Sequence, residues 1–407
     1  MFFCYNINGD RMKKFLPRVF LFIIGIIIII GGIFIYNYLR VKYAKIEVTL
    51  KDNLTVEFLS ELHVSDFIKS INGKIIDDYI IDSKKVGTKH IKFNYINDDK
   101  IKVSYEFDVD VIDTVKPMIW LGDNYRVKVG SDIDIVNSIL CGDNYDPNPK
   151  CYIEGEYDLN TEGDYDLVYK AIDKSGNEET KPFTLNVYKP VKETKKDEEN
   201  YTLFDDIKSM HKTDTNKIGL DISSHQGDID FEKIKNSGVE FLMIRVGYKK
   251  GTDGEYVLDS KFKEYIENAN KYGIKAGVYF YSYADSVEMA RADANWVLSQ
   301  IKDYKIDLPV CFDWEEWRYF NEFKISFYEL TTMAEEFVKV VEKKGYKGML
   351  YSSKKYLEYI WLKNDLDIWL AQYNDTVTYE GNYKIWQISD NGKIDGIKHP
   401  VDIDIMY

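Results

Sequence analysis

Two carboxylates, Asp313 and Glu315, lie two residues apart in the segment LPVCFDWE. On a strand this spacing sends both side chains to one face, where each disfavours ionisation of the other, and burial beside Trp314 and Trp317 adds to the effect. A carboxyl group that keeps its proton near neutral pH can protonate a glycosidic oxygen. We expect Glu315, which has the longer reach, to be this general acid, with Asp313 ionised beneath it. The neighbouring Glu316 is expected on the opposite, outer face.

Eight short apolar runs in the C-terminal half are the elements that must position this pair, with helical patterns between the early ones. Alternating strands and helices predict a parallel sheet, and eight strands predict an irregular α/β, TIM-like barrel. Helices are predicted over 262–272 and 287–301, and after the capping box of Ser326 and Glu329. The gap from 373 to 383 has no room for a helix, so the helices should be concentrated in the first half. The runs cover residues 218–223, 241–248, 275–282, 308–315, 347–353, 368–373, 383–389 and 401–407.

Further acidic residues lie where such a barrel places its reactive groups, at the carboxyl ends of strands. Asp221 lies in the second half of the first run, and Asp402 or Asp404 belongs to the last. Arg245 is the only obvious cation on the early strands. These inward carboxylates predict an acidic active site, and a structural salt-bridge network is the alternative.

Aromatic and amide side chains near the strand ends predict a sugar-binding groove. Sugar rings have apolar faces that stack on aromatic rings, and amides bond to their hydroxyl groups. Any one such residue can instead belong to the packed core; Tyr281 and Trp369 are the preferred candidates. The lone His225 is assigned no proton transfer. The predicted substrate-binding residues are Tyr248, Tyr281, Trp369, Gln372, Tyr373 and Trp386, with Gln387 as a further amide.

Five segments resemble, in the same order, the signatures of glycoside hydrolase family 25 lysozymes: GLDISSHQGDIDF, DWE, IWLAQY, IWQIS and VDIDIMY. The resemblance implies an irregular, helix-poor barrel that cleaves the β-1,4 bond between N-acetylmuramic acid and N-acetylglucosamine in peptidoglycan. By position it implies Glu315 as general acid, Asp313 as its partner, and Asp221 and Asp402 as flanking acids. The family usually has Asn where this chain has Asp404, which adds a negative charge near the site.

The Asp-x-Glu pair also resembles that of substrate-assisted hexosaminidases, in which the 2-acetamido oxygen of the sugar attacks the anomeric carbon. Asp313 would then orient the acetamido group and balance the charge of the oxazolinium. Inversion, with Asp221 or Asp402 activating water, is the alternative mechanism. A non-catalytic wall-binding adhesin or scaffold is the alternative function, and chitin-like polymers are an alternative substrate.

Composition excludes other classes of function. A formal charge of −14 argues against nucleic-acid binding, which requires basic patches. The five histidines are scattered, no CxxC occurs, and no glycine-rich phosphate loop is present, so no metal site and no cofactor are predicted. Peptidoglycan glycan strands are the predicted partner.

An uncharged apolar run covers residues 19–35 and extends to residue 39. A helix of this length reaches about 31 Å, the thickness of a bilayer core. No A-x-A-like cleavage site follows, so we expect an uncleaved single-pass anchor rather than a signal peptide. Four basic residues before the run and three after it favour a cytoplasmic N-terminus. A lysozyme domain would find its substrate only outside the membrane, so we expect the N-terminus in the cytoplasm and the other domains outside, facing the cell wall.

Residues 44–190 contain short alternating runs broken by Asn, Asp and Gly, a pattern typical of β-sandwiches and similar to bacterial immunoglobulin-like modules. Asp108, Asp110 and Asp113 are interpreted as a solvated strand face, with a calcium site as the alternative. Cys141 and Cys151 form either a loop disulfide or two free thiols. The predicted parts are an N-terminal tail and anchor (1–43), two immunoglobulin-like modules (44–114 and 115–190), a polar linker (191–214) and the catalytic barrel (215–407).

Overall fold

The computed structural model describes residues 9–190 and 201–407. The chain forms two compact units, Met1–Thr114 and Val115–Tyr407. Part of the predicted linker, residues 191–200, and Cys4 lie outside the described residues.

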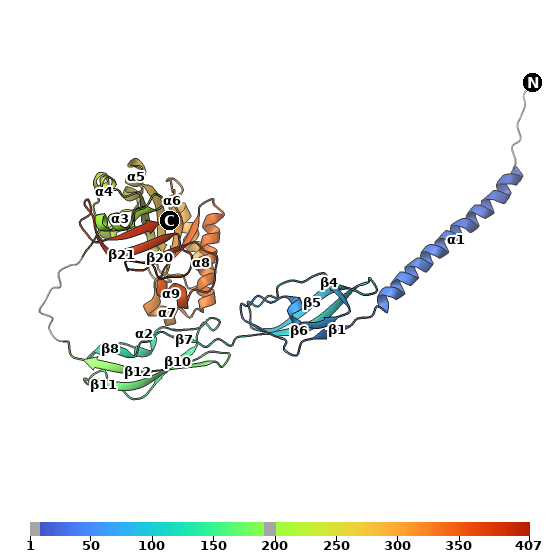
Figure 1. Cartoon of the computed structure of the whole chain (residues 1–407), viewed down its shortest axis with the longest axis horizontal. Coiled ribbons are helices and arrows are strands. Elements are labelled where there is room, and N and C mark those ends of the chain that lie inside the picture. The colour runs from blue at the N-terminus through green and yellow to red at the C-terminus, as the bar shows by residue number, and fades with distance from the viewer. Residues whose placement is uncertain (1–8, 191–200) are drawn as a thin grey trace, which may run out of the picture. The chain divides into compact units, whose positions relative to one another are not determined.

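A long apolar helix, α1 (Gly9–Lys42), begins the described chain (Figure 1). By length and composition its segment Phe20–Lys42 is sufficient to cross a membrane, a property that an N-terminal signal sequence shares. Its described side chains are not packed against the rest of the unit, as expected for an apolar surface that needs a nonaqueous environment.

The first β-module (residues 44–114) is built around a long antiparallel hairpin. Along β5 and β6 buried and exposed residues alternate, so one face of the sheet covers an apolar core around Phe93 and Tyr95. On the exposed face Asp108 pairs with His90 and Asp110 accepts from Thr88, which accounts for two of the three aspartates considered as calcium ligands. The elements are β1 (Val48–Leu50), β2 (Thr55–Glu57), η1 (Val64–Phe67), β3 (Ile68–Ile71), β4 (Gly73–Ile75), β5 (Gly87–Asn97) and β6 (Lys102–Ile112).

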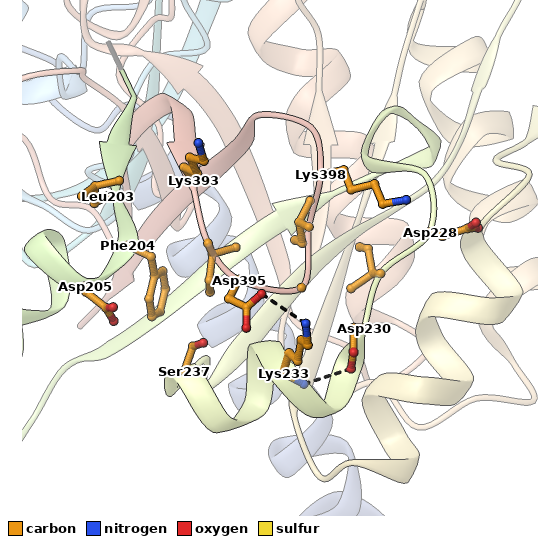
Figure 2. Close-up of a pocket in the computed structure, with 14 residues that line it drawn as sticks. Leu203, Phe204, Asp205, Asp228, Asp230, Lys233, Ser237, Lys393, Asp395 and Lys398 are labelled. Carbon is orange, nitrogen blue, oxygen red and sulfur yellow. Dashed lines mark hydrogen bonds and ion pairs between the residues drawn. The ribbon is translucent and has the colours of Figure 1, made fainter. Parts of the chain in front are cut away.

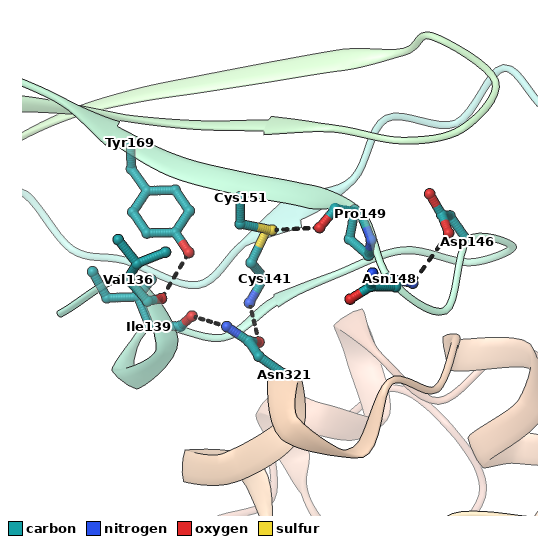
Figure 3. Close-up of a disulfide and its surroundings, with 9 residues drawn as sticks. All are labelled: Val136, Ile139, Cys141, Asp146, Asn148, Pro149, Cys151, Tyr169 and Asn321. Atoms are coloured by element: carbon teal, nitrogen blue, oxygen red, sulfur yellow. Dashed lines mark hydrogen bonds between the residues drawn. A yellow bond between two sulfur atoms is a disulfide. The ribbon is translucent and has the colours of Figure 1, made fainter. Parts of the chain in front are cut away.

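The second β-module (residues 115–190) has a four-stranded sheet in the order β10-β11-β12-β8 and a two-stranded sheet of β7 and β9. Cys141 on β9 and Cys151 on β10 are joined by a disulfide, the first of the two alternatives (Figure 3). The elements are β7 (Met118–Ile119), β8 (Asn124–Lys128), α2 (Ile135–Ser138), β9 (Cys141–Gly142), β10 (Lys150–Glu154), β11 (Gly163–Ile172) and β12 (Glu178–Tyr188).

The C-terminal domain is a closed barrel of eight strands, each of which coincides with one of the eight apolar runs. Neighbouring strands pair in chain order, and β21 and β22 close the ring. Two short extra strands, β13 (Thr202–Leu203) and β16 (Tyr256–Leu258), pair at its edges. The barrel strands are β14 (Lys217–Ile222), β15 (Phe241–Lys249), β17 (Lys275–Tyr281), β18 (Val310–Asp313), β19 (Gly348–Ser353), β20 (Ile368–Ala371), β21 (Ile385–Lys393) and β22 (Val401–Met406).

Helices follow the early strands, as predicted, and flank the outside of the barrel in Figure 1. The capping box of Ser326 and Glu329 is present at the start of α8. No helix separates β20 from β21 or β21 from β22. The helical elements are α3 (Phe204–His211), η2 (Ser224–Gln226), α4 (Phe231–Ser237), α5 (Phe262–Lys271), α6 (Val287–Ile301), η3 (Trp317–Tyr319), α7 (Phe320–Phe323), α8 (Phe327–Glu342) and α9 (Lys354–Tyr359).

The structure corrects two expectations. Strand β22 runs antiparallel to both of its neighbours, because the seven-residue connection before it is too short for a helical crossover. Residues 202–211, assigned to the linker, instead form β13 and α3. Phe204 and Ile207 lie one turn apart on α3 and are buried in the barrel's outer core, which suffices to fix this polar segment.

Candidate active site

Period-two alternation along the barrel strands sends one set of side chains into the barrel and the other toward the helices. On β18, Phe312 packs in the outer core, whereas Cys311 packs in the inner one and Asp313 shares its face. Asp313 is the last residue of β18 and is 3% exposed. Glu315 follows in the loop and is accessible to solvent at the mouth of the barrel.

Glu316 does not lie on the outer face as expected. It is 9% exposed, and its Oε1 accepts a hydrogen bond from the Tyr281 hydroxyl at 2.8 Å. The strand ends at Asp313, so strand alternation no longer determines where the next side chains point. Glu316 therefore adds a third carboxylate beside the pair.

Asp221 and Asp402 lie directly opposite each other on the antiparallel strands β14 and β22. One amide joins them, since Gln387 Nε2 donates to Asp221 Oδ2 at 2.6 Å and to Asp402 Oδ2 at 3.4 Å. The Gln387 carbonyl oxygen accepts from the hydroxyls of Tyr351 and Tyr373 at 2.9 and 2.8 Å. Gln387 is thus the centre of a network that holds both flanking acids in place.

The carboxyl pKa values in this site are raised. Burial raises the pKa of Asp313 well above its ordinary value, and the charge of Glu315 raises it further. The pKa of Glu315 is also raised, mainly by partial removal from water and then by the charges of Asp221 and Glu316. The pair therefore keeps at least one proton near neutral pH. In the free protein Asp313 is the more deeply buried of the two, so its ionisation, expected from sequence, is the less favourable one.

Burial also raises the pKa of Asp221 and of Asp402, whose charge is opposed by that of its neighbour Asp221. Arg245 partly offsets the rise at Asp221 and at Asp313. Its guanidinium, however, is bound to the buried Asp259 at 2.9 Å, so the site keeps an excess of acidic groups.

Asp404 lies deeper in the barrel and is completely buried. The indole Nε1 of Trp369 donates to its Oδ1 at 2.8 Å, while its Oδ2 has no hydrogen-bond partner among the described residues. Burial raises the pKa of Asp404 well above its ordinary value. Trp369 itself is 1% exposed and packs in the barrel interior, so it lies beneath the groove and offers no free face for stacking.

The other predicted substrate-binding residues divide into two groups. Tyr281, Tyr373 and Tyr248 remain partly accessible; Tyr281 bonds Glu316 and Tyr373 bonds Gln387. Trp386 and Gln372 do not line the groove: Trp386 lies in the outer core, where its ring meets His211 of α3. The side chain of Gln372 bonds the loop at residues 376–378.

Two tyrosines of the site were not singled out from the sequence. Tyr351 on β19 is bound to Gln387, and Tyr279 on β17 hydrogen-bonds to Asp221. Both lie on the inward face of their strands, like Asp313. Strand alternation within the runs 275–282 and 347–353 was the signal that could have identified them.

Several hollows lie on the C-terminal domain. One of about 440 Å³ adjoins the carboxylates and is lined by Tyr283, Glu316 and Tyr319, among others. A larger one of about 870 Å³, shown in Figure 2, lies between α3, α4 and the loop before β22. Lys233 pairs with Asp395 across it at 3.4 Å. No carboxylate of the site above lines it, so we assign the chemistry to the barrel mouth.

Comparison with known proteins finds a family model that matches part of the chain. Residues 220–397 match the family model of glycosyl hydrolases family 25. The autolytic lysozyme of Clostridium acetobutylicum is 28% identical over 198 residues, which cover 46% of this chain and 54% of that protein. The uncharacterized protein YegX of Escherichia coli (strain K12) is 28% identical over 203 residues, 46% of this chain and 68% of YegX.

Solved structures are similar over about half of the chain. The modular autolysin LytC of Streptococcus pneumoniae, in complex with a synthetic peptidoglycan ligand, is 25% identical with a TM-score of 0.43, covering 59% of this chain and 56% of LytC. A family 25 glycosyl hydrolase from Bacillus anthracis is 22% identical with a TM-score of 0.41, covering 49% of this chain and 92% of that one. This chain spans about half the length of the Clostridium lysozyme and of LytC.

The matched residues include Asp221 and the Asp313–Glu315 pair. Over residues 220–397 this chain is therefore similar to glycosyl hydrolases family 25, and the likeness to the autolytic lysozyme supports a glycoside hydrolase of the lysozyme type.

Proposed function

We propose that this chain hydrolyses the β-1,4 bond between N-acetylmuramic acid and N-acetylglucosamine in peptidoglycan. The observation that carries the proposal is the Asp313–Glu315 pair at the end of β18, with raised pKa values and Glu315 accessible at the mouth of a family 25 barrel. Glu315 protonates the glycosidic oxygen as the bond to the anomeric carbon breaks.

In this mechanism the substrate's own 2-acetamido oxygen attacks the anomeric carbon and forms an oxazolinium, which water then opens. Asp313 accepts a hydrogen bond from the acetamido N–H. This contact favours the anionic form of Asp313 and moves the shared proton toward Glu315 when substrate binds. Glu315, now a carboxylate, takes a proton from the attacking water and returns to its starting state.

The environment of the flanking acids favours this route over inversion. A general base must be ionised near the working pH. The raised pKa values of Asp221 and Asp402 and their shared bond to Gln387 oppose such a role. Both acids instead remain beside the pair as polar groups held in place by Gln387. NMR of the first product should show the β-anomer, as a retaining mechanism requires. Initial release of the α-anomer would instead support the inverting mechanism.

The rest of the chain fits a tether. We propose that α1 is an uncleaved membrane anchor with a cytoplasmic N-terminus, and that the β-modules are immunoglobulin-like spacers outside the cell. A peptidoglycan hydrolase has its substrate outside the membrane, which supports this orientation. Anchoring would confine cleavage to wall near the membrane, as local remodelling requires.

The test uses the full chain in detergent, incubated with purified peptidoglycan beside Glu315→Gln. Glu342→Gln, at the exposed end of α8, is the matched control. Products are reduced with borohydride and identified by mass spectrometry. Reduced muramic-acid ends from the parent and the control alone support the proposal, with a loss in rate of about 10²–10⁴-fold for Glu315→Gln. Wall binding without released saccharides from any variant would favour the adhesin alternative.

A further inference from the structure

The second β-module contacts the loop that carries Glu315. We call residues 139–144 of the module the docking segment, and residues 314–326, between β18 and α8, the acid loop. Both belong to one compact unit, Val115–Tyr407. Leu140 of the docking segment is 7% exposed and packs in the outer core of the barrel domain together with Phe320 and Phe327.

The side-chain amide of Asn321 on α7 forms two hydrogen bonds to the backbone of the docking segment, one through its oxygen and one through its nitrogen (Figure 3). Its Oδ1 accepts from Cys141 N at 2.9 Å, and its Nδ2 donates to the carbonyl of Ile139 at 2.9 Å. The two backbone groups belong to residues that are two apart in the docking segment. This pair of bonds therefore fixes both where α7 lies along the docking segment and how far from it α7 lies. The disulfide to Cys151 in turn ties the docking segment to β10.

The far end of the acid loop is held by the same segment. The first N–H groups of a helix have no partner within the helix. In α8 two of them are satisfied by the module: Phe327 N donates to the carbonyl of Asp143 at 2.8 Å, and Tyr328 N to that of Asn144 at 3.3 Å. The next, Glu329 N, is capped by Ser326 Oγ. The docking segment therefore completes the N-terminus of α8.

Aromatic rings continue the contact toward the catalytic pair. Trp120 of the module packs on Tyr356 with ring centroids 5.4 Å apart. Tyr356 stacks on Trp317 at 3.9 Å and 17°. Trp317 meets Trp314 at 4.8 Å, and Trp314 stands in sequence between Asp313 and Glu315.

The fit is close enough to require a particular residue. A Cβ atom on Gly142 would lie 2.6 Å from Phe327 Cε1 and 2.8 Å from Phe320 Cε1, which no van der Waals contact allows. Gly122 of the same module has no such neighbour, since the nearest atom to its Cβ position is 3.9 Å away. The two glycines give a matched pair of substitutions.

We propose that the second β-module is a positioning element of the active site, which fixes the acid loop and hence the geometry of Glu315, with Asn321 and Trp120 as its positioning residues. This inference rests on the proposed function. The predicted spacer thus acts on catalysis, and an acid loop freed from it would misplace Glu315 relative to the bond it must protonate. A misplacement of about 1 Å can lower a rate by about 10²-fold.

The test measures kcat, KM and the pH profile of the full chain with Asn321→Ala, Trp120→Ala and Gly142→Ala. The controls are Gly122→Ala and Tyr157→Ala, an exposed aromatic of the module. We expect kcat to fall by about 10-fold or more with KM within about two-fold, and Trp120→Phe to recover most of the loss because it retains a ring.

The pH profile separates positioning from a loss of stability. Glu315 is faced by the carboxyls of Asp313, Asp221 and Glu316 and by the hydroxyls of Tyr281, Tyr351 and Tyr356. A loosened acid loop admits water, which lowers the pKa of Glu315, so the alkaline limb of kcat/KM moves to lower pH. The two controls should leave this limb in place.

Three outcomes decide the matter. If Asn321→Ala and Gly142→Ala are folded and have the kcat and the alkaline limb of the parent chain, the inference is overturned. The proposed hydrolase function would be unaffected. A fall in kcat that follows only the fraction of unfolded protein, with an unchanged limb, also overturns it. An inactive parent chain overturns the proposed function, which the Glu315→Gln comparison detects separately.

Discussion

In the proposed mechanism, the proton shared by Asp313 and Glu315 determines whether the pair can act. Glu315 would have to be protonated when substrate binds, and its raised pKa, caused by partial burial and neighbouring charges, keeps this form present at higher pH than for a free carboxyl group. Activity should therefore fall as the pH rises through the pKa of Glu315. Every nearby negative charge extends the active range toward alkaline pH.

Glu316→Gln tests this electrostatic account. The substitution removes a charge that raises the pKa of Glu315 but keeps an oxygen that can accept from the Tyr281 hydroxyl. We expect the alkaline limb of kcat/KM to move to lower pH while the maximum changes by less than about 10-fold. The pH-rate profile on peptidoglycan measures it, with Glu342→Gln as control. An unchanged limb would mean that Glu316 does not act on Glu315.

Asp404→Asn tests the buried carboxyl that departs from the usual family residue. The folded-state pKa of Asp404 is raised, so the folded protein keeps a proton that the unfolded chain loses above about pH 4. Stability contributed by this group therefore falls as the pH rises above that value. Asn has no such loss and retains an acceptor for Trp369.

We expect Asp404→Asn to raise the melting temperature more at pH 7 than at pH 4. Thermal unfolding at both pH values measures the difference, and Asp390→Asn, at an exposed position of β21, is the control. An equal change at the two pH values would contradict the raised pKa.

Among the elements, α3 is the one that the sequence least suggested. Most of its residues are polar, but two, Phe204 and Ile207, are buried on the face that packs against the barrel. Phe204→Ala should lower the free energy of unfolding by about 3–5 kcal/mol, because it leaves a cavity in a packed core. Met210→Ala on the exposed face of the same helix should change it by less than about 0.5 kcal/mol. Urea unfolding compares the two; equal values would place α3 outside the folded domain.

Elements with a strong local pattern were predictable from sequence. All eight barrel strands and the helix after Ser326 follow from apolar runs and a capping box. The direction of β22 was not predictable in this way, because it depends on how a short connection returns across the closed sheet. The prediction that Trp386 binds substrate was wrong because the apolar run shows that side chains alternate between two faces but does not show which face points into the barrel. The inward position of Glu316 depends on the turn after β18, which strand alternation does not describe.

For the whole molecule, the proposed anchor α1 would determine where cleavage can occur. A chain held by one helix would act only on wall within reach of its modules, whereas a chain released by signal cleavage would diffuse away. The second module adds a further dependence, because it contacts the acid loop and belongs to the same compact unit as the barrel.

The last prediction is that the mature chain keeps its N-terminal segment and stays in the membrane. A predominantly apolar helical segment of 23 residues is long enough to hold a protein in a bilayer through alkaline carbonate extraction. We expect the full chain in the carbonate-resistant pellet, with an intact mass that includes residues before Phe20. A variant that begins at Tyr43 should appear in the soluble fraction yet release saccharides from suspended peptidoglycan at the parent rate, because both β-modules and the barrel remain. A mature chain whose mass shows that it begins after residue 39 would instead mean that α1 is a cleaved signal sequence. This result would overturn the proposed membrane tether and leave the proposed chemistry of the barrel unaffected.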